Sequence, residues 1–509
     1  MAESLAGEPA ARESRQAWLA LWSLLFGFFM MLVDSTIVSI ATPTLMQAFE
    51  ADVGEVVWVT SAYLLAYAVP LLITGRLGDR FGPKTIYLVG LTIFTLASVA
   101  CGLAWSIEAL IVARVVQGFG AALLTPQTMA IITRLFPPQR RGAAMGVWGA
   151  TAGVATLAGP LLGGVLIDGL GWEWIFFVNA PVGVVGFIMV VRNVPALEKH
   201  AHRFDWLGVV LSAVGLFCIV FGIEEGQTYA WGHIWGPFSV WGLIITGVVV
   251  MVAFVVWQAA QKGEPLLPLQ LFGDRNFAMA NVSAAAMGAM ITAMVFPLLL
   301  YVQNVRGLAP TQAALLTVPM ALISGGLAPV VGRLIDKRDP RPIAVAGFVL
   351  LAAALVLHSA LMRPGMPVLW LLVPYGLVGL AMGGIWGPLS VSATRNLPPH
   401  WAGAGSGVYN STRQLGAVLG SASIAAVMQS RLAVNLTGAG AGAGDGHGAG
   451  VGRVPAVIAA PFTKAMSESM WFPVAAAVVG LVGALLMAPH RVAADGVGAP
   501  AGHSVAGRG

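Results

Sequence analysis

One carboxylate stands deep within an apolar stretch near the start of the chain. Asp34 follows the run FGFFMMLV and is flanked by Ser35 and Thr36. An ionisable group placed that far inside an apolar segment is a functional candidate by default. Because burial disfavours the charged form of a carboxyl group, such a residue can take up and release a proton near ambient pH. We therefore predict that Asp34 couples proton movement to function and, when deprotonated, attracts a cationic substrate. The alternative is a neutral Asp34 that is hydrogen-bonded to a neighbouring helix.

Two arginines also fall within apolar segments. Arg114 is followed by Gln117 and Gly118, which share its face of a helix. A cation at this depth requires a carboxylate, carbonyl groups or water. Two roles for Arg114 stay open: a structural tie between helices, and the tuning of a nearby acid during proton transfer. For Arg413 we expect a structural role.

A binding pocket in such a protein is expected to be wide and mostly apolar. Aromatic, amide and methionine side chains near the middle of apolar segments are the candidates, although most such side chains simply pack or face lipid. With Asp34, the predicted substrate-binding residues are Tyr63, Gln127, Met290 and Trp386.

A charged turn, GRLGDRFGPK at residues 75–84, contains Gly75, Asp79 and Arg80. One interpretation is a basic anchor loop at a membrane surface. The other is a conformational latch, in which Asp79 faces a helix N-terminus in another part of the molecule, where the helix dipole favours an anion. The similar string GRLIDK at 332–337 adds Asp336 to this predicted latch.

The composition indicates that most of these segments lie in a lipid bilayer rather than in water. The chain has 509 residues, of which 58% are hydrophobic and 10% charged. A transmembrane helix needs about 20 apolar residues. Runs of this length predict an all-α integral membrane protein with fourteen spans, at 18–41, 55–75, 85–104, 107–129, 142–165, 173–192, 206–223, 237–258, 277–301, 311–332, 342–361, 367–390, 403–427 and 470–488.

The distribution of charge supports this count and orients the chain. With the N-terminus inside, twenty Lys and Arg residues fall in inner segments and five in outer ones. This is the bias that places basic loops in the cytoplasm. We therefore predict both termini in the cytoplasm, an inner (plasma) membrane location, and no nucleic-acid binding despite the net charge of +5. The two cysteines, Cys101 and Cys218, lie in apolar runs and are expected to be buried thiols.

Two segments repeat at nearly one spacing. GRLGDR at 75–80 precedes GRLIDK by 257 residues, and FPPQRRGAAMGVW at 136–148 precedes LPPHWAGAGSGVY by 261. Two related halves around a midplane site are typical of secondary transporters. The predicted domains are an N-terminal tail 1–17, a six-helix bundle 18–192, a linker with two inserted helices 193–276, a second six-helix bundle 277–488 with a flexible outer loop 429–469, and a C-terminal tail 489–509.

Together these motifs resemble the major facilitator superfamily, and within it the fourteen-helix drug:proton antiporters of the EmrB/QacA type. Residues 75–84 resemble motif A, 110–122 resemble motif B with Arg114, and 32–45 and 172–183 resemble segments typical of that family. The string ATLAGPLLGG resembles the antiporter motif C and contains Gly159, Pro160, Gly163 and Gly164. The resemblance implies a major facilitator fold and export rather than uptake. Independently, a proline in a helix predicts a kink, and the glycines predict close helix approach.

The function that these features favour is proton-coupled export of amphipathic drugs or antibiotics by alternating access. The alternatives are a dedicated exporter of one endogenous metabolite or self-made antibiotic, and, with less support, a membrane enzyme or a non-transporting receptor. No hydrolase, zinc-protease or nucleotide-binding motif occurs in the sequence. We expect no cofactor or metal, with protons, a small-molecule substrate and the lipid bilayer as partners, and a monomer.

Overall fold

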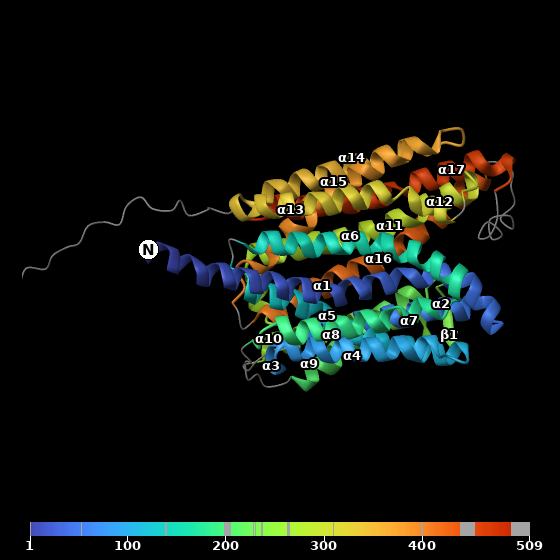
Figure 1. Ribbon diagram of the computed structural model, residues 1–509. Helices are drawn as coiled ribbons and strands as arrows, with labels where there is room; N and C mark the ends of the chain where they lie inside the picture. The colour runs from blue at the N-terminus through green and yellow to red at the C-terminus, as the bar shows by residue number, and fades with distance from the viewer. Residues whose placement is uncertain are drawn as a thin grey trace, which may run out of the picture.

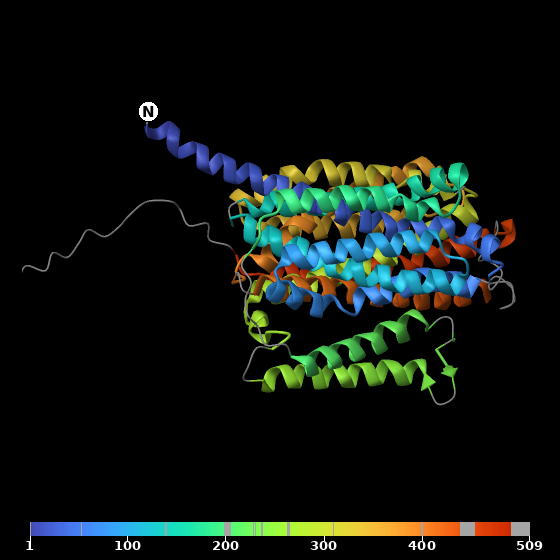
Figure 2. The same cartoon turned by 60° about the horizontal axis from the view of Figure 1, so that its bottom comes forward.

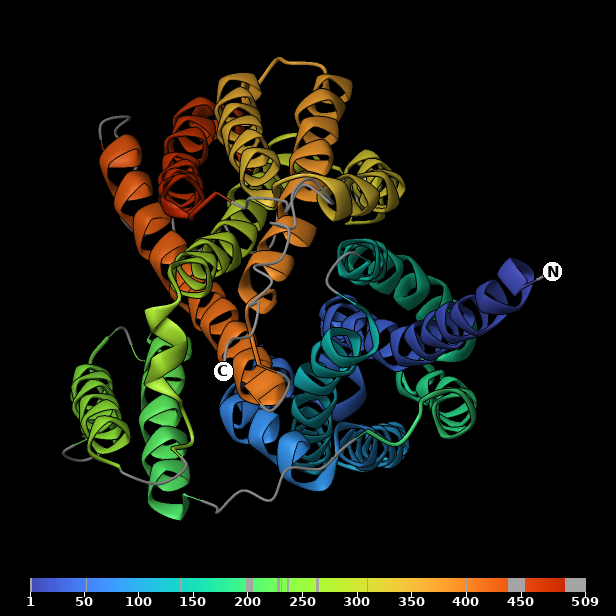
Figure 3. The same ribbon diagram turned by 90° about the vertical axis from the view of Figure 1, so that its left-hand side faces the viewer.

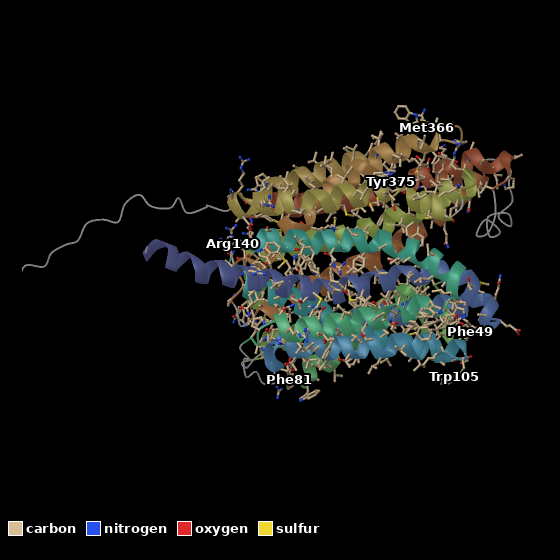
Figure 4. All side chains as sticks on the ribbon, viewed as in Figure 1. Phe49, Phe81, Trp105, Arg140, Met366 and Tyr375 are labelled. Carbon is tan, nitrogen blue, oxygen red and sulfur yellow. The ribbon has the colours of Figure 1, made fainter. Side chains whose placement is uncertain are left out.

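The chain forms a bundle of long helices that run in nearly the same direction (Figure 1). This computed structural model describes residues 2–51, 53–137, 140–197, 205–226, 229, 231–235, 238–261, 265–308, 310–398, 401–437 and 454–489. Figure 4 identifies the two ends of the bundle: Phe81 and Arg140 lie at one end, and Phe49, Trp105 and Met366 lie at the other. We call them the Arg140 end and the Trp105 end.

The helices form two groups. Figure 3, which looks down the bundle axis, shows the groups side by side. The first group comprises α1 (Ala2–Phe49), α2 (Val53–Ala68), α3 (Leu71–Phe81), α4 (Pro83–Gly102), α5 (Ile107–Leu135), α6 (Arg141–Leu170), α7 (Trp174–Phe177) and α8 (Asn179–Asn193). The second comprises the 3-10 turn η1 (Leu269–Gly273), α11 (Arg275–Leu300), the π-helical turn η2 (Tyr301–Val305), α12 (Pro310–Leu315), α13 (Val318–Lys337), α14 (Pro340–Leu361), the 3-10 turn η3 (Val368–Leu371), α15 (Leu372–Thr394), α16 (Ala402–Thr437), α17 (Ala456–Ser469) and α18 (Trp471–Leu486).

In chain order, the segment between the two groups forms a separate helical pair, α9 (Trp206–Glu224) and α10 (Val240–Ala260). Figure 2 shows this pair standing along one flank of the bundle. The two helices are joined at the Trp105 end by a short antiparallel hairpin of β1 (His233–Trp235) and β2 (Phe238–Ser239). The pair contacts the bundle through α9, which packs against α2 and α16.

The inserted pair is bonded to α3 at the Arg140 end, where the predicted charged turn 75–84 is helical up to Phe81 and the chain reverses only at Gly82. The Arg76 guanidinium donates from Nε to the Leu266 carbonyl at 3.1 Å and also bonds the Pro265 carbonyl. The next residue, Leu267, donates its N–H to the side chain of Gln258 on α10. Gln258 in turn donates to Asp205, the residue that caps the N-terminus of α9. The segment 265–267 is therefore held from both sides.

Among the described residues, twelve helices are long and apolar enough to cross a bilayer. The count is thirteen if α2 and α3, which meet at a 47° bend, form one span. The bend falls at Pro70, where the predicted span 55–75 is broken, because proline lacks the N–H that a continuous helix requires. The predicted span 142–165 lies in the 30-residue helix α6, where several side chains are outside the description. The predicted count of fourteen is not confirmed.

Two predicted boundaries differ from the structure. Helix α16 continues to Thr437, and α17 begins at Ala456, so the expected flexible loop 429–469 is helical at both of its ends. At the start of the chain, α1 extends into the predicted N-terminal tail. Apolar run length alone does not mark these ends, because helices continue beyond the hydrocarbon core wherever packing supports them. The predicted C-terminal tail lies almost wholly outside the described residues.

The predicted close approach at motif C is observed between α6 and α1. A Cβ added at Gly159 would collide with the Thr36 hydroxyl, and one at Gly163 would lie 2.8 Å from Ile37 Cγ1. Gly164 instead faces open space, with no atom within 4 Å of its added Cβ. Gly159 and Gly163 therefore allow α6 to pack against the turn of α1 that follows Asp34. The side chain of Pro160 lies outside the description, so its kink stays a prediction.

Gly159→Ala should therefore weaken the packing of α6 on α1. Overpacking a close helix contact costs about 1–3 kcal/mol, so we expect a lower midpoint of thermal unfolding for the purified protein. Gly164→Ala is the matched control, because it adds the same methyl group on the same helix where space is open. Equal midpoints for the two variants would contradict this account of the interface.

Candidate functional site

Asp34 and Arg114 form an ion pair in the interior of the first helix group. Asp34 Oδ2 lies 2.5 Å from Arg114 Nη1, and both side chains are fully buried. The second carboxylate oxygen, Oδ1, accepts hydrogen bonds from the amide groups of Gln117 at 2.9 Å and Asn179 at 2.8 Å. Helices α1, α5 and α8 thus meet at one carboxylate, and Arg114 bonds across helices as in the first of the two roles left open for it, while its role in proton transfer stays a prediction.

The hydrogen-bond partners of Asp34 are those that a carboxylate requires. Both oxygens accept from donors, namely a guanidinium and two amide nitrogens. A protonated carboxyl group would need an acceptor for its own hydrogen, whereas a carboxylate accepts at both oxygens and is further stabilised by the adjacent cation. The arrangement therefore fits ionised Asp34. A neutral Asp34 hydrogen-bonded to its neighbours, the alternative considered from the sequence, does not match this set of donors.

Arg114 is fixed by further contacts on α2 and within α5. Its Nε donates to the Val59 carbonyl at 3.1 Å, and Nη1 also donates to Gln117 Oε1 at 2.7 Å. The guanidinium carbon lies 4.1 Å from the centroid of the Tyr63 ring, in cation–π geometry. Helix α2 therefore contacts the guanidinium through the Val59 carbonyl and the Tyr63 ring, while Asp34 of α1 neutralises its charge.

Asn179 is the residue of this site that sequence reasoning missed. It begins α8 directly after the short helix α7, and its amide donates both to Asp34 and to Ser98 Oγ at 2.9 Å. Ser98 on α4 donates in turn to the Phe176 carbonyl. Asn179 lies within a segment that carried the family resemblance, and this was its only sequence signal. Ser35 and Thr36, which flank Asp34, instead bond carbonyls of their own helix.

At the Arg140 end, Asp79 caps a helix of the opposite group, as predicted. Its Oδ1 and Oδ2 accept the backbone N–H groups of Gly403 and Ala404, each at 3.0 Å, in the first turn of α16. The carboxylate thus meets unpaired amides and the positive end of the helix dipole. An added Cβ at Gly75 or at Gly403 would collide with the backbone of the other residue, so glycine at both positions permits the close approach.

Asp336 makes the same contact in the reverse direction. It lies near the end of α13 and accepts from the N–H groups of Gly142 at 2.8 Å and Ala143 at 3.3 Å, in the first turn of α6. The carboxylates are related by the first repeat offset (336 − 79 = 257), and the capped residues by the second (403 − 142 = 261). Each group therefore caps a helix of the other at the Arg140 end. We call the two contacts together the paired caps.

The paired caps include a cation that the sequence did not single out. Arg134, near the end of α5, forms an ion pair with Asp79 at 2.6 Å. Arg80, which was predicted to be part of the latch, places its guanidinium over the Phe81 ring, and its part in the latch stays a prediction. Arg141 adds a direct tie between the groups, donating to the Thr133 and Thr394 carbonyls.

The predicted substrate-binding residues do not gather around one open surface. Tyr63 is 2% exposed beneath Arg114, and Met290 is fully buried in α11. Gln127 is also buried and donates to the Thr74 carbonyl of α3, near the paired caps. Asp34 is closed off by its own partners. Of the five, Trp386 alone keeps partial exposure in this conformation, and it lies where α15 meets Gly149 of α6. The two cysteines are buried free thiols, as expected.

The two groups, their repeat-related caps and the buried ion pair can be compared with known proteins. The model of the Major Facilitator Superfamily matches residues 24–421. The chain belongs to this superfamily. It is a multi-pass membrane transporter of this superfamily rather than an enzyme.

Relatives within the Major Facilitator Superfamily cover most of the chain. The uncharacterized MFS-type transporter Rv1250 of Mycobacterium tuberculosis is 51% identical over 94% of this chain and 82% of its own length. The tetracenomycin C resistance and export protein of Streptomyces glaucescens is 33% identical over 84% of this chain and 79% of its own. The crystal structure of the human organic anion transporter MFSD10 matches with a TM-score of 0.62 at 14% identity, over 91% of this chain and 99% of that one, and supports the fold alone.

Asp79→Ala should shift the transporter toward conformations that are open at the Arg140 end. The variant removes the acceptor of two backbone N–H groups and the partner of Arg134, and each charge-assisted hydrogen bond contributes about 1.5–3 kcal/mol. Distances between spin labels on α3 and α16 should lengthen or broaden. Asp339→Ala is the control, because Asp339 caps α14 within its own group. A distance distribution unchanged from that of the wild type would remove Asp79 from the closure.

Proposed function

We propose that this transporter exports small amphipathic molecules, among them drugs or antibiotics, in exchange for protons. The observation that carries the proposal is the ionised Asp34, sealed between Arg114 and two amides in the helix group that also supplies Asp79 to the paired caps. Such a carboxylate has no access to water here. Its protonation therefore requires a different conformation, and this requirement links proton uptake to movement of the protein.

The order of events follows from the charges. While Asp34 is ionised, its attraction to Arg114 holds α1 against α5. Protonation removes this attraction and leaves Arg114 with the Val59 carbonyl, Gln117 and the Tyr63 ring. Because losing one member of a buried pair destabilises the arrangement by about 3–5 kcal/mol, the helices rearrange. Proton release restores the pair, and the cycle returns to the conformation described here.

The direction of transport is part of the same proposal. The basic loops support an orientation in which the Arg140 end, and both chain termini, face the cytoplasm of a plasma-membrane protein. The paired caps then close the cytoplasmic side, and the substrate leaves toward the Trp105 end. Protons moving inward provide the free energy, about 2.3 kcal/mol for each charge that crosses 100 mV. Since one chain contains both helix groups and both caps, we propose that a monomer performs the cycle.

A dedicated exporter of one antibiotic or metabolite is the second candidate. The relative from Streptomyces glaucescens is named for resistance to, and export of, a single compound, tetracenomycin C. Screening toxic compounds in an efflux-deficient host distinguishes the two candidates. Raised tolerance to several unrelated compounds supports the broad exporter, and raised tolerance to one chemical series supports the dedicated one.

Asp34→Asn should abolish export driven by a proton gradient while the protein still inserts into the membrane. Asparagine keeps the size and one acceptor oxygen but cannot carry the proton. In proteoliposomes, with a compound to which the wild type confers tolerance, uphill transport should be lost while downhill exchange of the compound continues. Glu108→Gln, at an exposed acid of α5, is the control. Wild-type uphill rates in Asp34→Asn would exclude Asp34 from the coupling, and loss of both activities would indicate a purely structural role.

A further inference from the structure

A second arginine lies inside the helix bundle without a carboxylate partner. Arg413 is the twelfth residue of α16, far from the paired caps at the start of that helix. No ion pair joins it to an acid among the described residues, and its buried Nε lacks a hydrogen-bond partner. Its guanidinium carbon lies 5.7 Å from the centroid of the Trp386 ring. Among the described residues, this ring contact joins the Arg413 side chain to another helix, and the structural role expected from the sequence stays a prediction.

The sequence explains why no acid meets Arg413. From Arg275 to Thr437, which includes α11 and α13–α16, the only acidic residues are Asp336 and Asp339. Asp336 caps α6 at the Arg140 end, and Asp339 caps α14. In the other helix group, Asp34 is already neutralised by Arg114. A cation inside a membrane is costly unless it is paired or hydrated. Arg413 is only partly buried, so its positive charge, which no described acid neutralises, is within reach of water or a bound molecule.

The face of α16 that bears Arg413 looks toward the junction between the two helix groups. Asn410 lies three residues earlier on this face, is fully buried and approaches Met129 of α5, in the other group. Its Oδ1 atom has no hydrogen-bond partner among the residues that the structure describes. Trp386 lies at the same junction, beside Gly149 of α6. An unpaired cation, an unsatisfied acceptor and a partly exposed indole therefore converge between groups that must separate during transport.

The geometry points to a substrate subsite at Arg413 and Trp386 that binds an aromatic molecule through an acidic substituent. The guanidinium supplies charge-assisted hydrogen bonds to a carboxylate, sulfonate or phenolate, and the indole supplies a surface for a planar ring. The Asn410 oxygen can accept from a hydroxyl group on the same molecule. This inference rests on the proposed export function and deepens it. The subsite does not use Asp34, whose carboxylate is paired with Arg114 in this conformation.

Dye binding to the full chain in phosphatidylcholine nanodiscs tests the subsite. The probes are anilinonaphthalene sulfonate, its uncharged parent N-phenyl-1-naphthylamine, and the cation ethidium, with empty nanodiscs as background. Arg413→Gln should weaken binding of the sulfonate by about tenfold or more, the cost expected for losing a charge-assisted contact. Binding of the uncharged dye should change by less than about twofold. Arg413→Lys, which keeps the charge but not the planar fork, should lie between wild type and Arg413→Gln.

Arg431→Gln is the matched control, because Arg431 lies on the same helix but is half exposed and pairs with Glu468 at 3.7 Å. It should leave all three dissociation constants unchanged. Equal losses for the charged and uncharged dyes in Arg413→Gln would show a packing role and overturn the subsite. So would failure of the wild type to bind the sulfonate, or its tighter binding of ethidium.

The experiments distinguish failure of the subsite from failure of the export proposal. If the sulfonate binds through Arg413 but proteoliposomes show no proton exchange, the subsite stands and proton-coupled export does not. If export is intact while Arg413→Gln leaves sulfonate binding unchanged, the subsite alone is wrong.

Discussion

The structure depends on the rule that a charge removed from water must find a partner. Asp34 and Arg114 satisfy it by pairing at 2.5 Å, with amides from α5 and α8 completing the carboxylate. A pair of this kind adds little stability when intact, because desolvation offsets most of the attraction, but separating it is expensive. An interaction that is cheap to keep and costly to break suits a protein that alternates between two arrangements. The same rule gives Arg413 its importance, since there the partner is missing.

The paired caps show how an internal repeat is used in three dimensions. Each helix group contributes one carboxylate, which accepts from backbone N–H groups of the other helix group. The two contacts therefore cross the junction between the groups in opposite directions. Their symmetry has an energetic consequence. Opening the Arg140 end breaks two similar sets of backbone contacts together, and the close backbone approach at Gly75 and Gly403 separates with them. A cooperative step of this kind favours distinct closed and open states over a continuous range of partly open ones.

Much of this architecture could be predicted from the sequence, because a protein that crosses a lipid bilayer needs long apolar runs and has basic loops on one side. The cap at Asp79 could also be foreseen, since a lone acid in a glycine-rich turn suits a helix N-terminus. What could not be predicted were partners brought together only by tertiary packing. Asn179 meets Asp34 across 145 residues, and Arg134 resembled any other basic residue of an inner loop. The break at Pro70 and helix α17 were missed because hydropathy measures apolar length rather than continuity.

The segment at 265–267 gives the inserted pair a meaning beyond additional length. Arg76 of α3 donates to carbonyls of this segment, which Gln258 and Asp205 hold from the other side. Excising α9 and α10 would therefore remove the side chains of Gln258 and Asp205, which hold the segment that accepts from Arg76, three residues before Asp79. The linker between the halves therefore contacts α3 close to the paired caps, and a flexible linker of equal span would lack these contacts.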